Sequence, residues 1–249
     1  MRHQELVDLD LSGVKWEISD VQTNTKNTQI APAAASNAPG RTMATIVPPI
    51  VPAQPMTIQT ANAMAARPND IDSLCRMVGE FNHPLRVTAK NVVLPHVAPN
   101  PNGVLIITDM PGASDDESGQ ILSGPAGELL DKMLGAIGMS RDNVSILPMI
   151  FWRTPGGRAP TDNEIDFAYP FVTRFIEMMS PKIIISMGTI ATQKIGGVAP
   201  SKNYGNVIDA PGGIKMIPIY HPNYLLLKPS AKRDAWNGLQ NVQNLLKIG

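Results

Sequence analysis

The hydrophobic residues of this chain gather in four short runs separated by polar stretches. The runs lie at residues 104–108, 144–150, 182–186 and 214–220, and the turn sequence Met110-Pro111-Gly112 follows the first of them. Short, continuous apolar runs bounded by turn residues are typical of strands buried on both faces of a sheet. The pattern therefore predicts four buried strands.

Between these runs, apolar residues recur every three or four positions, as they do along one face of a helix. This spacing predicts helices at residues 127–137, 189–195 and 231–247. Another helix should begin at Thr161, which has capping-box spacing to Glu164, and Pro170 should bend or break it. Asp70 or Asp72 should cap an earlier helix, which carries Ile71, Leu74, Met77 and Val78.

Strands that alternate with helices indicate the α/β class. We expect a three-layer α/β/α sandwich in which helices cover both faces of a four-stranded parallel sheet. In such folds, ligands bind at the carboxyl ends of the strands. The loops that follow the four predicted strands are therefore the first places to look for chemistry.

The N-terminal quarter of the chain has a different pattern. Residues 23–68 are dominated by Ala, Pro, Thr, Asn and Gln, a composition that buries too little apolar surface to offset its ordering entropy. We predict an arm and a Pro/Ala-rich linker over residues 1–68, and a folded domain over residues 69–249. Residues 1–22 are interpreted either as a loosely ordered arm or as a docking segment for a protein partner.

Composition narrows the functional classes. The chain has 21 basic and 21 acidic residues, so any contact with nucleic acid must come from a local patch. Its one cysteine, Cys75, excludes an internal disulfide and a multi-cysteine metal site. No apolar run is long enough to span a membrane, and the acidic N-terminus does not resemble a signal peptide. We expect a cytoplasmic protein with no membrane partner.

Two of the strand-end loops carry candidate catalytic groups. Asp109 follows the first strand, and His221 follows the fourth strand and precedes Pro222. Either side chain alone is commonly structural. Together, a carboxylate and an imidazole permit water activation and stabilisation of a leaving group.

Other residues of these loops suggest contacts with a polyanion. Arg153 and Arg158 lie in a Gly- and Pro-rich loop, where they are either phosphate contacts or solvated surface residues. The run Leu225-Leu226-Leu227 beside Lys228 is either core or an apolar wedge for a base stack. The cluster Asp115-Asp116-Glu117 is interpreted as a solvated turn, and no metal site is expected there because no histidine completes a ligand set.

Four of these segments, in order, resemble the family 4 uracil-DNA glycosylases. The family's Gly-Glu-Ala-Pro-Gly motif is similar to residues 108–112, its Gly-Arg-Pro-Phe-Val-Gly-Arg-Ala-Gly stretch to residues 119–127, and its Arg-Pro-Pro-Gly-Asn-Arg-Thr-Pro motif to residues 153–160. Its His-Pro loop with trailing leucines is similar to residues 221–229. The resemblance covers residues 81–246.

The resemblance implies hydrolysis of the N-glycosidic bond of uracil, or of a related damaged base, as the first step of base excision repair. Asp109 would position the attacking water, and His221 would stabilise charge on the uracil oxygen. Base flipping would give access, and the leucine loop would fill the vacated stack. The implied substrate-binding residues are Met110, Pro111, Gly112, Leu122 and Pro148, and the implied DNA contacts are Arg153, Arg158, Asn223, Tyr224, Leu225 and Lys228.

Several positions depart from the family pattern. Asp109 replaces Glu, Leu122 replaces the phenylalanine that stacks on uracil, and Pro148 replaces the asparagine that reads the uracil edge. The cysteines that ligate the family's iron–sulfur cluster correspond to His83, Trp152 and Ala168, so no cofactor is expected. These departures keep a second hypothesis open, namely a catalytically weak or inactive adaptor that binds nucleic acid through a glycosylase fold.

Overall fold

The computed structural model describes residues 57–248, and its central element is a five-stranded sheet. The strands are β1 (Val104–Thr108), β2 (Val144–Pro148), β3 (Ile183–Met187), β4 (Ile208–Asp209) and β5 (Lys215–Ile219). Their order is β2-β1-β3-β5-β4, and all neighbours are parallel except β4, which is antiparallel to β5. The four predicted strands are confirmed. The short edge strand β4 was not predicted, because two residues carry no readable period.

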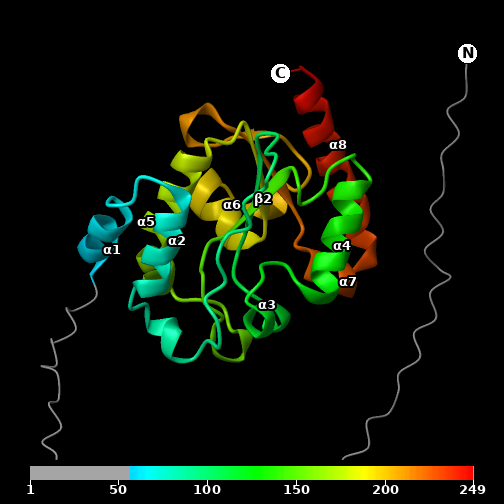
Figure 1. The fold of residues 1–249 in the computed structure, drawn as a ribbon. Helices are drawn as coiled ribbons and strands as arrows, with labels where there is room; N and C mark the ends of the chain where they lie inside the picture. Colours follow the sequence, from blue (N-terminus) through cyan, green and yellow to red (C-terminus); the bar gives the residue numbers. More distant parts are fainter. Residues whose placement is uncertain (1–56, 249) are drawn as a thin grey trace, which may run out of the picture. The chain divides into compact units, whose positions relative to one another are not determined.

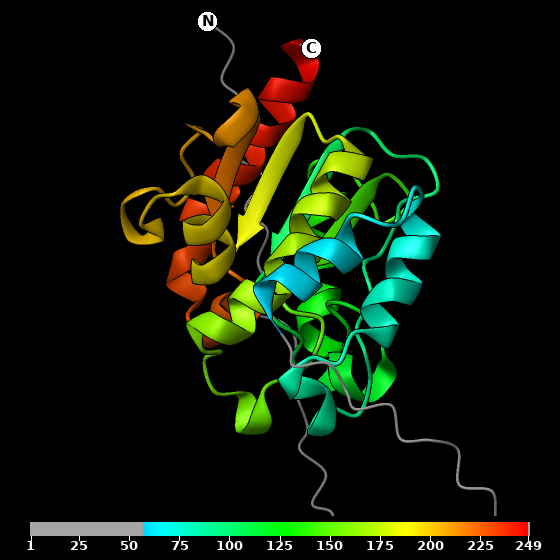
Figure 2. The ribbon, with the colours of Figure 1, turned by 90° about the vertical axis from the view of Figure 1, so that its left-hand side faces the viewer.

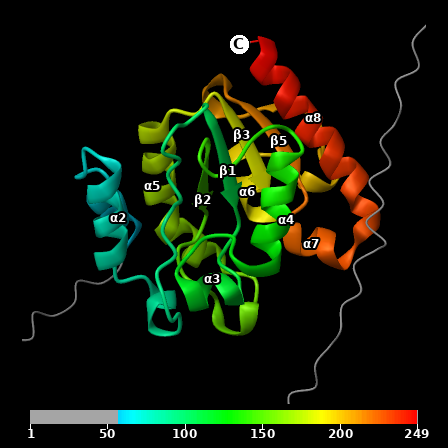
Figure 3. The ribbon, with the colours of Figure 1, turned by 45° about the vertical axis from the view of Figure 1, so that its right-hand side comes forward.

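Helices cover both faces of this sheet, as the three-layer prediction required (Figure 1, Figure 3). The helices are α1 (Ile58–Ala65), α2 (Ile71–Glu80), α3 (Ala113–Ser118), α4 (Gly124–Gly135), α5 (Asp162–Met179), α6 (Thr189–Gly196), α7 (Pro222–Leu227) and α8 (Lys232–Ile248). Short 3₁₀ turns are Pro84–Val87, Pro155–Gly157, Pro200–Lys202, Pro211–Gly213 and Pro229–Ala231.

The core divides according to the alternation of side chains along the strands. On β1, Leu105 and Ile107 face the core under α1, α2, α5 and α6, whereas Val104 and Ile106 face the core under α4 and α8. Because β1 is buried on both faces, it needs apolar residues at every position, which is why its sequence is a continuous apolar run.

The predicted helix caps are present. The Asp70 side chain accepts a hydrogen bond from the Ser73 amide at 2.7 Å and caps α2. Thr161 and Glu164 form the capping box of α5. Of the two predicted outcomes at Pro170, a bend or a break, the break is wrong, because α5 continues through this residue. Pro170 is buried between the helix and its neighbours, and tertiary packing outweighs the lost backbone hydrogen bond.

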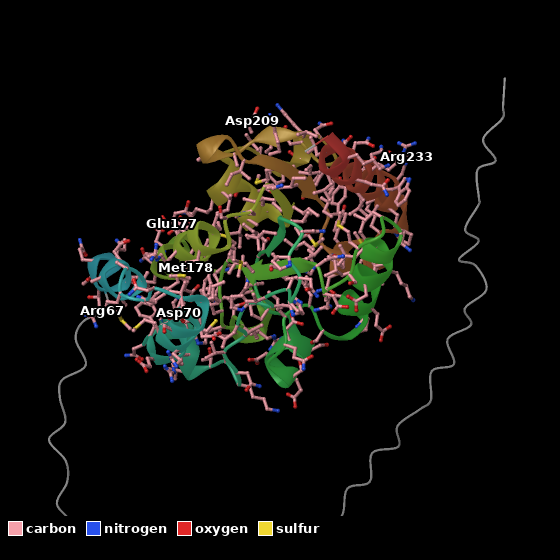
Figure 4. All side chains as sticks on the ribbon, turned by 45° about the horizontal axis from the view of Figure 1, so that its top comes forward. Arg67, Asp70, Glu177, Met178, Asp209 and Arg233 are labelled. Atoms are coloured by element: carbon pink, nitrogen blue, oxygen red, sulfur yellow. The ribbon has the colours of Figure 1, made fainter. Side chains whose placement is uncertain are left out.

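Helix α1 lies inside the segment that the sequence predicts to be a linker. Its Ala61 and Ala65 are buried, and α1 packs against α5 (Figure 2). Figure 4 shows Arg67 and Asp70, which lie between α1 and α2, on the same side as Glu177 and Met178 of α5. The ordered part of the chain therefore begins before residue 69. The predictions for residues 1–22 and 23–56 fall outside the described residues.

Within residues 57–248, no helix is long and apolar enough to cross a membrane. The same part of the chain holds no group of three or more His, Cys, Asp or Glu side chains arranged to bind a metal ion.

Candidate active site

The two candidate catalytic side chains line one cavity at the carboxyl edge of the sheet. Asp109 follows β1, His221 follows β5, and β3 lies between these strands. The cavity has a volume of about 440 Å³. We call it the tyrosine cavity, and its lining consists of Asp109, Gly188, Thr189, Ser201, Tyr204, Tyr220, His221 and Tyr224.

Asp109 is held by the first turn of α6. Its Oδ2 accepts a hydrogen bond from the Thr189 amide at 2.9 Å, and its Oδ1 accepts one from the Ala191 amide at 2.8 Å. Burial raises the pKa of this carboxyl, and the amides partly oppose that shift. The carboxylate is therefore fixed in direction, and each oxygen keeps a lone pair for a further donor.

Gly188 makes this contact possible. Its φ of 125° is accessible to glycine, and a Cβ added there would collide with the Asp109 carboxylate. The loop after β3 thus contributes to the site through the absence of a side chain.

His221 is the N-cap of α7. Its Nδ1 accepts a hydrogen bond from the Asn223 amide at 3.1 Å, so the ring proton lies on Nε2. Burial lowers the pKa of His221 to about 4, against an opposing effect of the nearby Asp115 charge. The imidazole is consequently neutral near pH 7, with Nε2–H as its donor.

Three of the four tyrosines stack on one another beside these groups. The Tyr204 and Tyr220 ring centroids are 3.7 Å apart at an interplanar angle of 25°, and those of Tyr220 and Tyr224 are 5.0 Å apart at 19°. The pKa of Tyr204 is raised by burial and by the neighbouring charges, Asp109 among them. Neither Tyr204 nor Tyr220 was predicted as a site residue, because Tyr204 lies outside the four motifs and Tyr220 lies just before the His-Pro motif.

A second cavity of about 480 Å³ also has His221 in its lining. We call it the loop-1 cavity, and its lining consists of Gly112, Ala113, Ser114, Asp115, Leu122, Ser123, Pro125, Ala126, His221, Asn223, Leu226 and Leu227. His221 is common to the two cavities.

Asp115 organises the loop-1 cavity and was missed by the sequence analysis. It is 6% exposed rather than solvated, and it lies in helix α3 rather than in a turn. Its Oδ2 accepts from the Gly112 amide at 2.9 Å, and its Oδ1 accepts from the amide and the hydroxyl of Ser123 at 2.7 and 2.9 Å. Gly112 has no side chain to complete a capping box, so no cap signal in the sequence marks Asp115 as buried.

Leu122 has an unusual backbone conformation in this region. Its φ is 49°, which is uncommon for a residue other than glycine. The guanidinium of Arg141 donates to the carbonyl oxygens of Ile121 and Leu122 at 3.0 and 2.6 Å and holds the turn.

The predicted substrate-binding residues lie around the ends of β1 and β2 and in the loop after β1. Gly112 and Leu122 line the loop-1 cavity, whereas Met110, Pro111 and Pro148 line neither of the two cavities. Pro148 ends β2, where it is buried and paired in register with Thr108. Proline offers no side-chain donor there, and the Thr108 hydroxyl beside it is buried without a hydrogen-bond partner.

The leucine loop needs one correction. Leu225 is only 1% exposed and packs against Ala231 and Ala235, so it is a core residue rather than a DNA contact. Leu226 and Leu227 are 45% and 85% exposed. The helical phase of α7 decides which leucine is buried.

Of the remaining predicted DNA contacts, some are exposed to solvent and one is held in an ion pair. Asn223, Tyr224 and Lys228 are exposed, and Lys228 Nζ lies 5.9 Å from the centre of the Tyr224 ring. Arg158 instead forms a two-point ion pair with Glu164, at 2.6 and 2.8 Å, and it lowers the pKa of Glu164 to about 2. This pairing ties Arg158 to the start of α5.

The side chains that replace the family's cysteines form a packed cluster. His83 and Trp152 are fully buried, and their rings stack with centroids 4.6 Å apart at an interplanar angle of 8°. His83 Nδ1 accepts from the Leu85 amide, and Nε2 donates to the Glu164 carbonyl oxygen. Ala168 is buried in the same core. These side chains supply no thiolate, and both imidazole nitrogens are engaged, so the three positions do not fit an iron–sulfur cluster.

The fold and this site define a three-layer α/β/α protein with an acid and an imidazole at the carboxyl edge of its sheet. The chain belongs to the Uracil DNA glycosylase superfamily, whose family model matches residues 94–240. This result confirms the family predicted from the four motifs.

Individual relatives agree with this placement. The chain is 34% identical over 149 residues to the type-4 uracil-DNA glycosylase of Thermotoga maritima, which covers 58% of this chain and 78% of the relative. It is 30% identical over 162 residues to the type-4 uracil-DNA glycosylase of Pyrobaculum aerophilum, covering 61% and 81%. It is also 27% identical over 146 residues to a DNA polymerase of Bacillus phage SP01, covering 58% of this chain and 16% of that protein.

Proposed function

We propose that this chain is a DNA glycosylase that hydrolyses the N-glycosidic bond of uracil, or of a related damaged base, in DNA. The observation that carries the proposal is that Asp109 and His221, which are 112 positions apart in the chain, line one cavity at the ends of parallel strands. The names of the relatives, type-4 uracil-DNA glycosylases, support the same reaction. Such a reaction is the first step of base excision repair inside a cell.

The reaction assigns a role to each of the two groups. A water molecule hydrogen-bonded to the Asp109 carboxylate attacks C1′ of the deoxyribose and passes a proton to that carboxylate. The bond between C1′ and the base nitrogen breaks, and its electron pair remains on the base. His221 Nε2–H then donates a hydrogen bond to the base oxygen on which the negative charge develops. A neutral imidazole can fill this role because its Nε2–H is a donor while Nδ1 accepts the Asn223 amide.

The amides of α6 prepare Asp109 for this step. Thr189 and Ala191 hold both carboxylate oxygens, so the direction of the remaining lone pairs is set before the substrate arrives. A group held in advance costs no reorganisation during the reaction.

DNA would approach over α7. The exposed Leu226 and Leu227 provide apolar surface to fill the space left by an extruded base, and Lys228 provides a cation for a phosphate. Arg153 is the remaining candidate from the loop after β2, because Arg158 is paired with Glu164.

The test is release of free uracil from a single-stranded oligonucleotide that contains one deoxyuridine. We expect release by the wild-type chain and a loss of at least about 100-fold in Asp109→Ala and in His221→Ala. Release by the wild type that both variants retain would contradict the assigned roles.

A second candidate function is DNA binding without hydrolysis. One observation favours it: Pro148 stands where the family has an amide side chain, and proline offers no side-chain donor or acceptor there. It predicts no uracil release at micromolar protein together with salt-sensitive DNA binding. Binding that is lost with rising salt, without product, would favour this adaptor function over the enzyme.

A further inference from the structure

We infer that four positioning residues hold the loop at residues 153–158 beside Asp109, in place of the iron–sulfur cluster that the family pattern implies in this part of the fold. We call them the replacement cluster, and they are His83, Trp152, Arg158 and Glu164. The inference rests on the proposed function where it concerns catalysis, whereas the restraint on the loop is measurable without any activity. It gives Arg158 a partner inside the protein instead of a DNA phosphate.

The loop lies directly beside the backbone that carries the proposed catalytic acid. Just after β2, the amide of Ile150 donates to the carbonyl oxygen of Asp109 at 3.2 Å. Further along, the hydroxyl of Thr154 donates to the carbonyl oxygen of Arg158 at 2.6 Å and lies 3.5 Å from the sulfur of Met110. Thr154 is buried, so these contacts are shielded from water. A displaced loop therefore disturbs the backbone on which Asp109 is mounted.

Glu164 ties the far end of this loop to α5. Its carboxylate accepts two hydrogen bonds from the Arg158 guanidinium, at 2.6 and 2.8 Å, and one from the Thr161 amide at 2.7 Å. Only 10% of the Glu164 side chain is exposed, so water screens this pair less than an ordinary surface ion pair. A two-point pair fixes direction as well as distance. The pairing therefore holds Arg158, and through its carbonyl group Thr154, in one arrangement.

The stacked rings of His83 and Trp152 fix the near end of the loop. Trp152 immediately precedes the loop and is fully buried. His83 Nε2 donates to the backbone carbonyl oxygen of Glu164 at 2.9 Å, so the imidazole links Trp152 to the residue that also binds Arg158. One position of α5 thereby restrains both ends of the loop.

The donor atoms of this region do not suit an iron–sulfur cluster. Such clusters are held by cysteine thiolates, and the one cysteine of the chain, Cys75, lies in α2. Both nitrogens of His83 are engaged by backbone groups, and the indole nitrogen of Trp152 is a donor only. The restraint on the loop therefore comes from stacking, hydrogen bonds and one ion pair.

The experiment compares Glu164→Gln with the wild type in the full chain. Glutamine keeps an acceptor for the Thr161 amide but loses the charge that holds Arg158. Trypsin digestion followed by mass spectrometry measures cleavage after Arg153 and Arg158, and we expect cleavage there to be faster by about fivefold or more, because a released loop opens more often. We expect kcat for uracil release to fall by about tenfold with little change in KM, because the disturbed group is the acid rather than a DNA contact.

Asp166→Asn is the matched control. Asp166 lies on the same helix and pairs with Lys194 of α6 at 2.9 Å, so this variant removes an acid from an ion pair that does not involve the loop. We expect wild-type cleavage and wild-type kcat. A Glu164→Gln protein that fails to fold is replaced by Arg158→Gln, a change at a side chain that is 44% exposed, with faster cleavage after Arg153 and a lower kcat expected.

Iron analysis of the purified wild-type chain tests the other half of the inference. We expect no bound iron, no visible absorption band of an iron–sulfur cluster, and uracil release that an iron chelator leaves unchanged. Bound iron, or activity lost to the chelator, would overturn the inference.

Two results with the variants would also overturn it. One is a folded Glu164→Gln protein with the cleavage rate or the kcat of the wild type. The other is a lower KM in Glu164→Gln with kcat unchanged, which would show that the released Arg158 binds a phosphate. A wild-type chain that releases no uracil contradicts the proposed function, and the trypsin comparison then still decides whether the replacement cluster holds the loop.

Discussion

The imidazole of His221 has one nitrogen committed to the backbone and one that remains available for a substrate. Nδ1 accepts the Asn223 amide at the start of α7, which leaves Nε2–H as the donor of a side chain that lines the cavity. Folding and chemistry therefore depend on different atoms of the same side chain. A variant that keeps the first interaction and removes the second separates the two.

His221→Asn is that variant. Its side-chain oxygen can accept the Asn223 amide, since asparagine is among the best N-cap residues, but it has no group at the position of Nε2. We expect kcat to fall by about 10²- to 10³-fold, while the free energy of unfolding at pH 7 changes by less than about 1 kcal/mol. Denaturant unfolding and uracil release measure the two effects. A loss of stability well above about 1 kcal/mol, or an unchanged kcat, would contradict the assignment of folding to Nδ1 and chemistry to Nε2.

The same variant tests the lowered pKa of His221 through stability. The pKa is about 4 in the folded chain and 6.5 ordinarily, so between these values the unfolded chain binds a proton that the folded chain does not. The stabilising contribution is complete above pH 6.5 and is lost as the pH falls toward 4. We expect unfolding free energies of wild type, relative to His221→Asn, to decrease by up to about 1.4 kcal/mol per pH unit in this window. Taking the difference between the two proteins removes the contributions that the carboxylates and His83 make to the pH dependence of both. A pH-independent difference would show that His221 is not perturbed.

At the scale of elements, α7 shows how a short helix distributes three identical side chains. Leu225 packs against Ala231 and Ala235, whereas Leu226 and Leu227 reach solvent. Pro222 at the first turn and the His221 cap fix where α7 begins, and the start of the helix fixes which leucine points inward. The sequence run alone contains no such information, which is why core and wedge both stayed open for the run and Leu225 was named among the DNA contacts.

The two kinds of leucine should respond differently to truncation. We expect Leu225→Ala to lower the free energy of unfolding by about 2–5 kcal/mol, and Leu227→Ala to change it by less than about 0.5 kcal/mol. Leu227→Ala should instead lower kcat/KM on duplex DNA by about tenfold, with little effect on single-stranded DNA, because only the duplex leaves a vacated stack to fill. Parallel assays on the two substrates measure this. If Leu227→Ala lowered kcat/KM equally on duplex and single-stranded DNA, Leu227 would not act as a wedge.

Other elements could be predicted because the residues that determine them are neighbours in the sequence. β1, β2 and β3 are buried along their whole length, so each is apolar apart from one serine or threonine. The capping box of α5 pairs residues three apart, Thr161 and Glu164. In α5 this box also binds Arg158, because Glu164 accepts from Arg158 as well as from the Thr161 amide, and the arginine is thereby drawn away from the phosphate role expected of it.

At the scale of the whole molecule, the site depends on contacts that no local pattern encodes. The parallel order β1-β3-β5 brings Asp109, Gly188 and His221 to one edge, and strand-end reasoning predicted the acid and the histidine for that reason. Tyr204 follows the 3₁₀ turn Pro200–Lys202 and reaches the cavity only because this segment packs beside β5. Its place in the cavity lining is visible in three dimensions and not in the sequence.

The residue at which the folded unit begins also depends on packing between distant parts of the chain. Helix α1 was assigned to a linker because its apolar content is mostly alanine, yet Ala61 is fully buried where α1 meets α5. Small residues allow two helices to approach closely, so low hydrophobicity here reflects tight packing rather than disorder.

Replacing Ala61 with leucine in the full chain tests this interpretation. Overpacking a buried site usually costs about 1–3 kcal/mol, so we expect Ala61→Leu to lower the free energy of unfolding by that amount. Ala63→Leu is the matched control, because Ala63 is exposed on the same helix and its replacement has the same helix propensity. Urea unfolding of the two variants gives the comparison. If residues 57–68 acted as a linker, both substitutions would leave stability unchanged, and α1 would not belong to the folded unit.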